Sequence, residues 1–158
     1  MKNKKERDVV IVEKIIKYCD EVYSTHQMFN NDINLFRNQE VGFIYRNAIT
    51  MPILQIGELV KNVSDEFRAD NNNIPWKLLA RTRDFYAHNY GALDYDVTWD
   101  TSQNDIPKLK EELEDILLRN HYLTKFNEVD QIADKIQDAI DYGELDIGKN
   151  NRSVGQER

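Results

Sequence analysis

The chain contains little of what a secreted or membrane protein would need. Its 158 residues include one cysteine, Cys19, so no internal disulfide can form and a reducing cytoplasm is the expected location. The longest apolar runs, such as residues 9–12 and 51–54, are far too short to span a bilayer. The basic start of the chain leads into an amphipathic pattern and lacks the apolar stretch of a signal peptide. We therefore expect a cytoplasmic protein with no membrane association.

Ligand-binding motifs are also scarce. No group of His, Cys, Asp and Glu residues has the spacing of a metal site, and the chain has neither a glycine-rich phosphate loop nor a Ser-His-Asp pattern. We expect no metal and no cofactor. The formal net charge of −7 argues against a sequence-specific DNA-binding protein, because proteins that grip nucleic acid along a broad face are usually basic. Any contact with nucleic acid should be local, or should involve a short single-stranded substrate.

Proline and glycine are infrequent, and apolar residues recur at helical spacing. The spacing predicts helices over residues 7–25, 38–67, 75 to about 88–91, 94–99, from 105 onward and over 127–142, with a loop over residues 30–34. Pro52 should bend or divide the second helix. Gly57 in the same helix indicates close approach of another backbone, unless it reflects neutral drift. We predict an all-α, up-and-down bundle of four to five helices in one domain, residues 1–142, followed by a flexible polar tail, residues 143–158.

One segment of the chain concentrates chemically useful side chains. Arg83, Asp84, His88 and Tyr90 fall within eight residues. A permanent cation beside a group that titrates near neutral pH is what phosphodiester cleavage needs. Asp84 and His88 are four residues apart on the predicted helix, so the carboxylate could accept the imidazole N–H and fix its tautomer. Tyr90 could stack on a base or donate to a phosphate. The alternative is an ordinary solvated helix end with local hydrogen bonds.

The sequence around this segment, over residues 46–117, resembles the HepT-like branch of the HEPN superfamily, the toxin partners of minimal nucleotidyltransferase antitoxins. The resemblance is carried, in this order and spacing, by Gln55-Ile-Gly-Glu58, Ile74-Pro-Trp-Lys77, the Arg-x(4)-His-x-Tyr signature Arg83-Asp-Phe-Tyr-Ala-His88-Asn-Tyr90, Val97-Thr-Trp-Asp100 and Asp105-Ile-Pro-Lys-Leu-Lys110. Asn89 stands where Gly is common in the family, and Asp84 occupies a slot often filled by Asn. The segment after Tyr122 lies beyond the resemblance.

The resemblance implies a metal-independent endoribonuclease that acts as a homodimer, alone or within a larger hetero-oligomer, with two copies of the motif facing each other. In that scheme Arg83 and His88 are catalytic: His88 takes the proton of a ribose 2′-OH or protonates the departing 5′-oxygen, and Arg83 neutralises the phosphorane. The resemblance also implies that Tyr90 accepts AMP from the nucleotidyltransferase antitoxin, which silences the toxin. Glu58 either holds Arg83 of one of the chains or lies at the surface.

Two other readings of the same residues remain open. The protein could be a non-catalytic helical module that binds a nucleotide or substrate for a separate nucleotidyltransferase, with Arg83 and Tyr90 as phosphate and base contacts. It could also be an interaction scaffold whose motif has lost activity. The remaining histidines are predicted to be unimportant: His26 should be exposed, and His121 should lie at a helix end. The sequence leaves open whether the final helix covers the bundle or contacts a partner.

Overall fold

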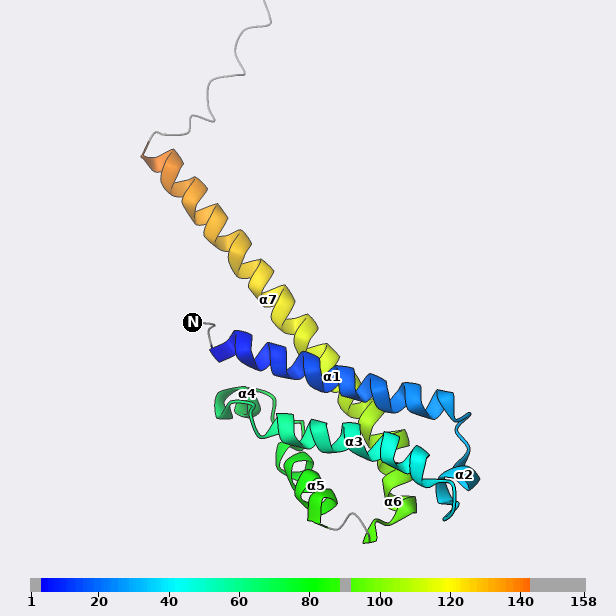
Figure 1. The fold of residues 1–158 in the computed structure, drawn as a ribbon. Helices are drawn as coiled ribbons and strands as arrows, with labels where there is room; N and C mark the ends of the chain where they lie inside the picture. Colours follow the sequence, from blue (N-terminus) through cyan, green and yellow to red (C-terminus); the bar gives the residue numbers. More distant parts are fainter. Residues whose placement is uncertain (1–3, 89–91, 143–158) are drawn as a thin grey trace, which may run out of the picture. The chain divides into compact units, whose positions relative to one another are not determined.

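The computed structural model describes residues 4–88 and 92–142, and over these residues it is helical without any strand (Figure 1). The predicted all-α class is therefore confirmed. Internal contacts divide the chain into two compact units, unit 1 (residues 1–117) and unit 2 (residues 118–158). The helices are α1 (Lys4–Met28), α2 (Ile33–Arg37), α3 (Phe43–Val60), α4 (Asp65–Asp70), α5 (Trp76–His88), α6 (Tyr95–Asp100) and α7 (Ile106–Asp141), with the π-helical turn η2 (Thr101–Asp105) joining α6 to α7.

The core of unit 1 lies along α3, which packs against α1 on one side and α5 on the other (Figure 1). Tyr45 and Phe36 are the largest side chains that are fully buried there. Burying one large apolar side chain contributes about 1.5–3 kcal/mol, so this layer dominates the stability of the unit. The core also contains the aromatic side chains Phe67, Trp76 and Tyr86. Its aliphatic side chains from α1, α3 and α7 include Val12, Ile15, Val22, Ile49, Ile56, Val60, Leu113 and Ile116.

The predicted loop over residues 30–34 contains the start of a short helix, α2. Asn30 and Asn31 turn the chain with φ angles of 54° and 50°, a conformation that asparagine tolerates better than most residues. Asp32 then caps α2, because its Oδ1 accepts hydrogen bonds from the backbone N–H groups of Asn34 (2.9 Å) and Leu35 (3.1 Å). A helix this short shows no apolar period, so the sequence pattern missed it.

The predicted helix over residues 38–67 is in fact two helices, α3 and α4. Pro52 lies inside α3, which continues past it, so the break occurs after Val60 instead. Ser64 caps α4 by accepting from the backbone N–H of Phe67 (3.2 Å). The cap is itself held from α1, where the buried carboxylate of Asp8 accepts from the backbone N–H (2.9 Å) and hydroxyl (2.6 Å) of Ser64. A residue 56 positions away in sequence therefore fixes the break.

The C-terminal helical path is longer than predicted. Asp94, where a short helix was predicted to begin, caps α6 by accepting hydrogen bonds from the backbone N–H groups of Asp96 (2.9 Å) and Val97 (3.1 Å). Asp105 does not cap a new helix, because α6, η2 and α7 follow one another without a break. The helix expected over residues 127–142 is the end of the 36-residue α7. No Gly or Pro occurs between residues 108 and 142 to interrupt it.

Unit 2 is represented among the described residues by α7 from Leu118 onward. Residues 143–158 lie outside the described part of the chain, so the predicted domain boundary at residues 142/143 and the flexible tail both stay predictions. No helix within residues 4–88 and 92–142 is both long and apolar enough to cross a membrane.

His26 is buried, which corrects the prediction that it is exposed. Its Nδ1 lies 2.5 Å from the hydroxyl of Tyr45 and its Nε2 lies 2.8 Å from the hydroxyl of Ser102, and its ring packs against Trp99. These contacts tie the last turn of α1 to α3 and η2. Burial lowers the pKa of His26 from 6.5 to about 4. The other prediction is also wrong, because His121 lies within α7 and not at a helix end.

Candidate functional site

The candidate site is built where α3 and α5 pack most closely, at Gly57. A Cβ atom placed on Gly57 would lie 2.5 Å from the Cβ of Arg83 and 3.0 Å from the carbonyl oxygen of Leu79, both on α5. Only a residue without a side chain allows this approach. The close contact predicted for Gly57 is confirmed, and it places the α3 residues that follow Gly57 directly beside Arg83.

Arg83 is held by carboxylates from both helices. Its Nε lies 2.8 Å from Oε2 of Glu58 on α3, and its Nη1 lies 3.3 Å from Oδ1 of the neighbouring Asp84. The side chain of Arg83 is still 36% exposed, so a substrate can reach the guanidinium. Ion pairs this exposed contribute about 0–1 kcal/mol to stability. Their clearer consequence is to fix the direction in which the guanidinium points.

Lys61 completes this charged cluster and was not anticipated from the sequence. Its Nζ lies 2.7 Å from Oδ1 of Asp84. The hydrogen bond from Lys61, followed by its charge and the contacts of Arg83, lowers the pKa of Asp84 below its usual value. A signal for Lys61 was present, because it is the C-cap residue of α3 and lies three residues after Glu58, on the same side of the helix end. We call Glu58, Lys61, Arg83 and Asp84 the Arg83 cluster.

His88 is the last residue of α5 and is exposed. Five residues on an α-helix correspond to a rotation of about 140°, so Arg83 and His88 of one chain project from different faces of α5. The recorded contacts of the Asp84 carboxylate are with Lys61 and Arg83, and a role for it in fixing the tautomer of His88 stays a prediction. Tyr90 lies outside the described residues.

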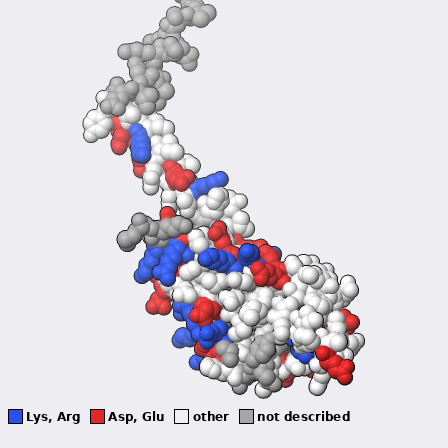
Figure 2. Space-filling view, in the orientation of Figure 1, with Lys and Arg blue, Asp and Glu red and all other residues white. Residues whose placement is uncertain are grey.

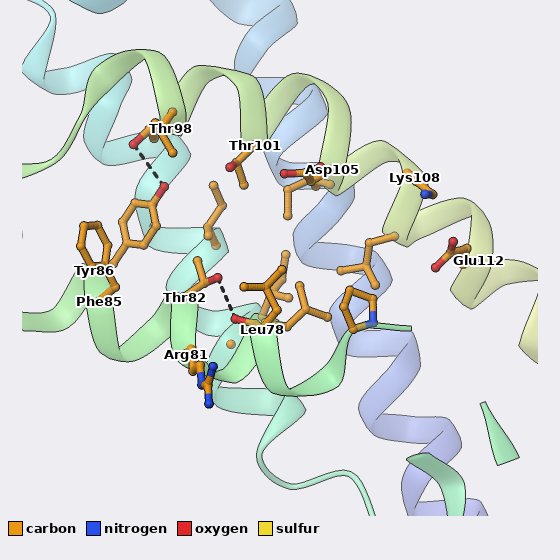
Figure 3. A pocket seen from close by; sticks show the side chains of 18 of the residues that line it. Leu78, Arg81, Thr82, Phe85, Tyr86, Thr98, Thr101, Asp105, Lys108 and Glu112 are labelled. Atoms are coloured by element: carbon orange, nitrogen blue, oxygen red, sulfur yellow. Dashed lines mark hydrogen bonds between the residues drawn. The ribbon is translucent and has the colours of Figure 1, made fainter. Parts of the chain in front are cut away.

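A cavity of about 620 Å³ lies between α3, α5 and the residues of α6, η2 and the start of α7 (Figure 3). Its walls are mostly apolar and include the exposed Leu78 and Phe85. Figure 3 shows one end of it closed by the hydrogen bond from Tyr86 to Thr98 (3.1 Å). The charged groups at its edge are mixed in sign: Arg81, Asp94, Asp105, Lys108 and Glu112. Such a mixed-charge, mostly apolar lining does not suit a polyanion.

The distribution of charge over the molecule fits a local site. On the face shown in Figure 2, basic and acidic side chains are interspersed over α1 and over the end of unit 1 that carries α4 and α5. They form no single basic surface on that face. Within residues 4–88 and 92–142, no group of three or more His, Cys, Asp or Glu residues is placed to hold a metal ion.

The all-α fold agrees with the fold of the HEPN class. The chain belongs to the ribonuclease HepT-like family, whose model matches residues 10–116. This match ends close to the boundary between the two units, so unit 2 lies beyond it.

Individual relatives agree with the family assignment. A Methanocaldococcus jannaschii protein named "Gamma-glutamylcyclotransferase and putative RNase" is 37% identical over 100 residues, which cover 63% of this chain and 41% of that protein. A "Putative RNase" of the same organism is 32% identical over 118 residues, which cover 71% of this chain and 89% of that protein. A "Probable ribonuclease HepT" of Thermococcus cleftensis is 41% identical over 67 residues, which cover 42% of this chain and 61% of that protein. The chain thus spans less than half the length of the first relative. No solved structure matches the chain significantly.

Proposed function

We propose that the protein is a metal-independent endoribonuclease toxin of the HEPN/minimal nucleotidyltransferase type, acting in the cytoplasm as a homodimer. The observation that carries this proposal is the Arg83 cluster, in which a partly exposed guanidinium is oriented by Glu58 and Asp84. Because His88 projects from a different face of α5 than Arg83, a site that uses both groups is most simply completed by a second chain. Membership of the ribonuclease HepT-like family supports the choice of RNA as substrate.

The proposed reaction divides its tasks between two side chains. His88 removes the proton from a ribose 2′-OH, and the 2′-oxygen attacks the adjacent phosphorus. The bond from phosphorus to the 5′-oxygen then breaks, and that oxygen takes up a proton. The products are a 2′,3′-cyclic phosphate and a 5′-hydroxyl. Arg83 stabilises the phosphorane, and its five N–H groups exceed what two carboxylates occupy, so donors remain for phosphate oxygens.

Control of the activity is proposed to occur at Tyr90, two residues beyond the end of α5. A cognate minimal nucleotidyltransferase antitoxin would transfer AMP to the phenol oxygen. The adenylate adds bulk and negative charge close to the catalytic residues in sequence, so it would compete with the RNA phosphate for Arg83. Replacing Tyr90 by Phe should preserve cleavage and prevent adenylation by the antitoxin. Adenylation of the Tyr90→Phe variant would place the acceptor elsewhere.

The second candidate is a non-catalytic helical partner that binds a nucleotide or substrate for a nucleotidyltransferase. It is favoured by the presence of two cations, Lys61 and Arg83, in one cluster, since phosphate binding by them would not require His88. In this case a nucleotide should bind saturably, and no RNA should be cleaved.

The proposal is tested with purified protein, a short RNA and EDTA. Cleavage should proceed in EDTA, and His88→Ala should abolish it. The matched control is His121→Ala, which removes an exposed histidine from unit 2 and should cleave like the unchanged protein. Equal activity of the two variants would remove His88 from the mechanism, and nucleotide binding without cleavage would favour the second candidate.

A further inference from the structure

Unit 2 exposes a series of large apolar side chains on α7. Between Leu118 and Ile136 the exposed fractions of these side chains range from 47% to 69%. The series consists of Leu118, Tyr122, Leu123, Phe126, Val129, Ile132 and Ile136. In proteins, most of the stability of a helix comes from packing its apolar face against a neighbour. These residues lie beyond the family match, which ends at residue 116, so the likeness to other ribonucleases does not explain them.

The spacing of these residues indicates what could cover them. From Tyr122 to Ile140 the apolar positions follow one another at alternating steps of four and three residues, which is the heptad pattern. A stripe that repeats every 3.5 residues stays at the contact between two helices that wind around each other. The heptad stripe consists of Tyr122, Phe126, Val129, Ala133, Ile136 and Ile140.

The residues beside the heptad stripe favour a parallel pairing of identical helices. Within each seven-residue repeat the stripe has two positions, and Phe126 and Ala133 are first positions. In a parallel pair in register, the residue just before a first position faces the residue five places later in the other helix. Lys125 would face Asp130 of the second copy, a pair of opposite charge, and Leu118 would face Leu123, an apolar pair. An antiparallel pair that overlays the same stripe would bring the two copies of Asp130 together, and like charges repel.

We propose that residues 118–142 form a parallel two-stranded coiled coil with the same segment of a second copy of this chain. The inference depends only on the sequence pattern and exposure of α7 in unit 2, and it holds whether or not the protein cleaves RNA. The second copy covers the heptad stripe, and the Lys125–Asp130 pairs set the direction of the two helices.

Disulfide trapping in the full-length chain tests this arrangement. The native Cys19 does not need to be replaced, because burial raises its pKa to about 12 and keeps it a buried thiol. Val129→Cys places a thiol in the heptad stripe and should give a cross-linked dimer under mild oxidation. The matched control Gln131→Cys places a thiol on the opposite side of the same helix and should remain uncross-linked.

The cross-link reports where two chains meet, so it distinguishes this interface from a pairing of unit 1 around the ribonuclease motif. An antiparallel pair would bring residue 129 opposite residue 133, and Val129→Cys alone would then fail to cross-link. Failure of Val129→Cys, or equal cross-linking of the Gln131→Cys control, would overturn the proposal. RNA cleavage by the same variants is a separate measurement, and its absence would count against the proposed function alone.

A charge exchange tests the direction of the helices independently. Lys125→Asp or Asp130→Lys alone should lower the association constant of the coiled coil by roughly two- to tenfold, because each dimer loses two opposite-charge pairs. The double variant should restore association, since the pairs re-form with exchanged signs. The extent of Val129→Cys cross-linking in low salt measures the effect, because it reports on this interface and not on a pairing of unit 1. A double variant as weak as the single variants would contradict the parallel arrangement.

Discussion

The two units of this chain use their apolar residues in opposite ways. In unit 1, large aliphatic side chains such as Ile15 and Ile49 are completely buried, and the exposed positions of the Arg83 cluster are charged. In unit 2, residues of the same kind, such as Val129 and Ile132, are more than half exposed. A buried apolar layer stabilises a unit by itself, whereas an exposed one indicates a surface that a partner covers. The difference separates the unit that carries the candidate site from the helix that we propose forms a coiled coil with a second copy.

The largest expected contrast between the units is in the cost of truncating isoleucine. Ile15→Ala should lower the free energy of unfolding of unit 1 by about 2–5 kcal/mol, because it removes fully buried methyl groups and leaves a cavity. Ile132→Ala, at an exposed position, should change it by less than about 0.5 kcal/mol. Both tryptophans, Trp76 and Trp99, lie in unit 1, so their fluorescence during denaturation reports on that unit. Equal losses of unfolding free energy in the two variants would contradict the contrast between a buried core in unit 1 and an exposed apolar surface in unit 2.

Acidic pH should also act on unit 1. The pKa of His26 is about 4 in the folded chain and 6.5 in the reference state, so the unfolded chain binds more protons between these values. Stability from the neutral His26 is therefore fully present above pH 6.5 and is lost as the pH falls toward 4. The loss should be on the order of 3 kcal/mol, measured by denaturant titration across this range.

The control for the acid effect is His26→Gln, which lacks the titrating group. This variant should be less stable at neutral pH by about 1–3 kcal/mol if it leaves the hydroxyl of Tyr45 or Ser102 unpaired. Its stability should also vary less between pH 6.5 and 4. If the variant followed the same pH dependence as the unchanged chain, His26 would not be the source of the effect.

A smaller effect is expected at the contact between α3 and α5. Gly57→Ala should destabilise unit 1 by about 1–3 kcal/mol, because the added methyl group cannot be accommodated against the α5 backbone without moving it. RNA cleavage should fall together with stability, since Arg83 moves with α5. Helix propensity alone would instead make this substitution stabilising by up to about 1 kcal/mol. Increased stability in denaturant titration would therefore contradict the close packing seen at Gly57.

Local patterns predicted the parts of the fold that neighbouring residues determine. Helical spacing predicted the all-α class, a short helix was expected to begin at residue 94, and Gly57 was expected to mark a close approach of backbones. The errors lie where residues distant in sequence decide the structure. Ser64 interrupts the predicted second helix because Asp8 binds it, and His26 is buried because it meets hydroxyl groups from α3 and η2. No local pattern contains these partners.

The candidate site was likewise predictable only where residues close in sequence determine it. The sequence left Glu58 open between a contact with Arg83 and a surface position, and the structure shows the contact within one chain. Lys61 was missed, although its spacing from Glu58 on one helix face contained the necessary signal. The contact between Lys61 and Asp84 depends on the register of α3 against α5, which Gly57 sets and which a single sequence does not display.

Mixing two inactive variants tests most directly whether unit 1 supplies a ribonuclease site shared between chains. Arg83→Ala and His88→Ala should each be inactive alone. After mixing and exchange of subunits, a mixed dimer carries one site with both groups intact, so activity should return to roughly one quarter of that of the unchanged protein. A mixture as inactive as its components would show that Arg83 and His88 do not act together across two chains.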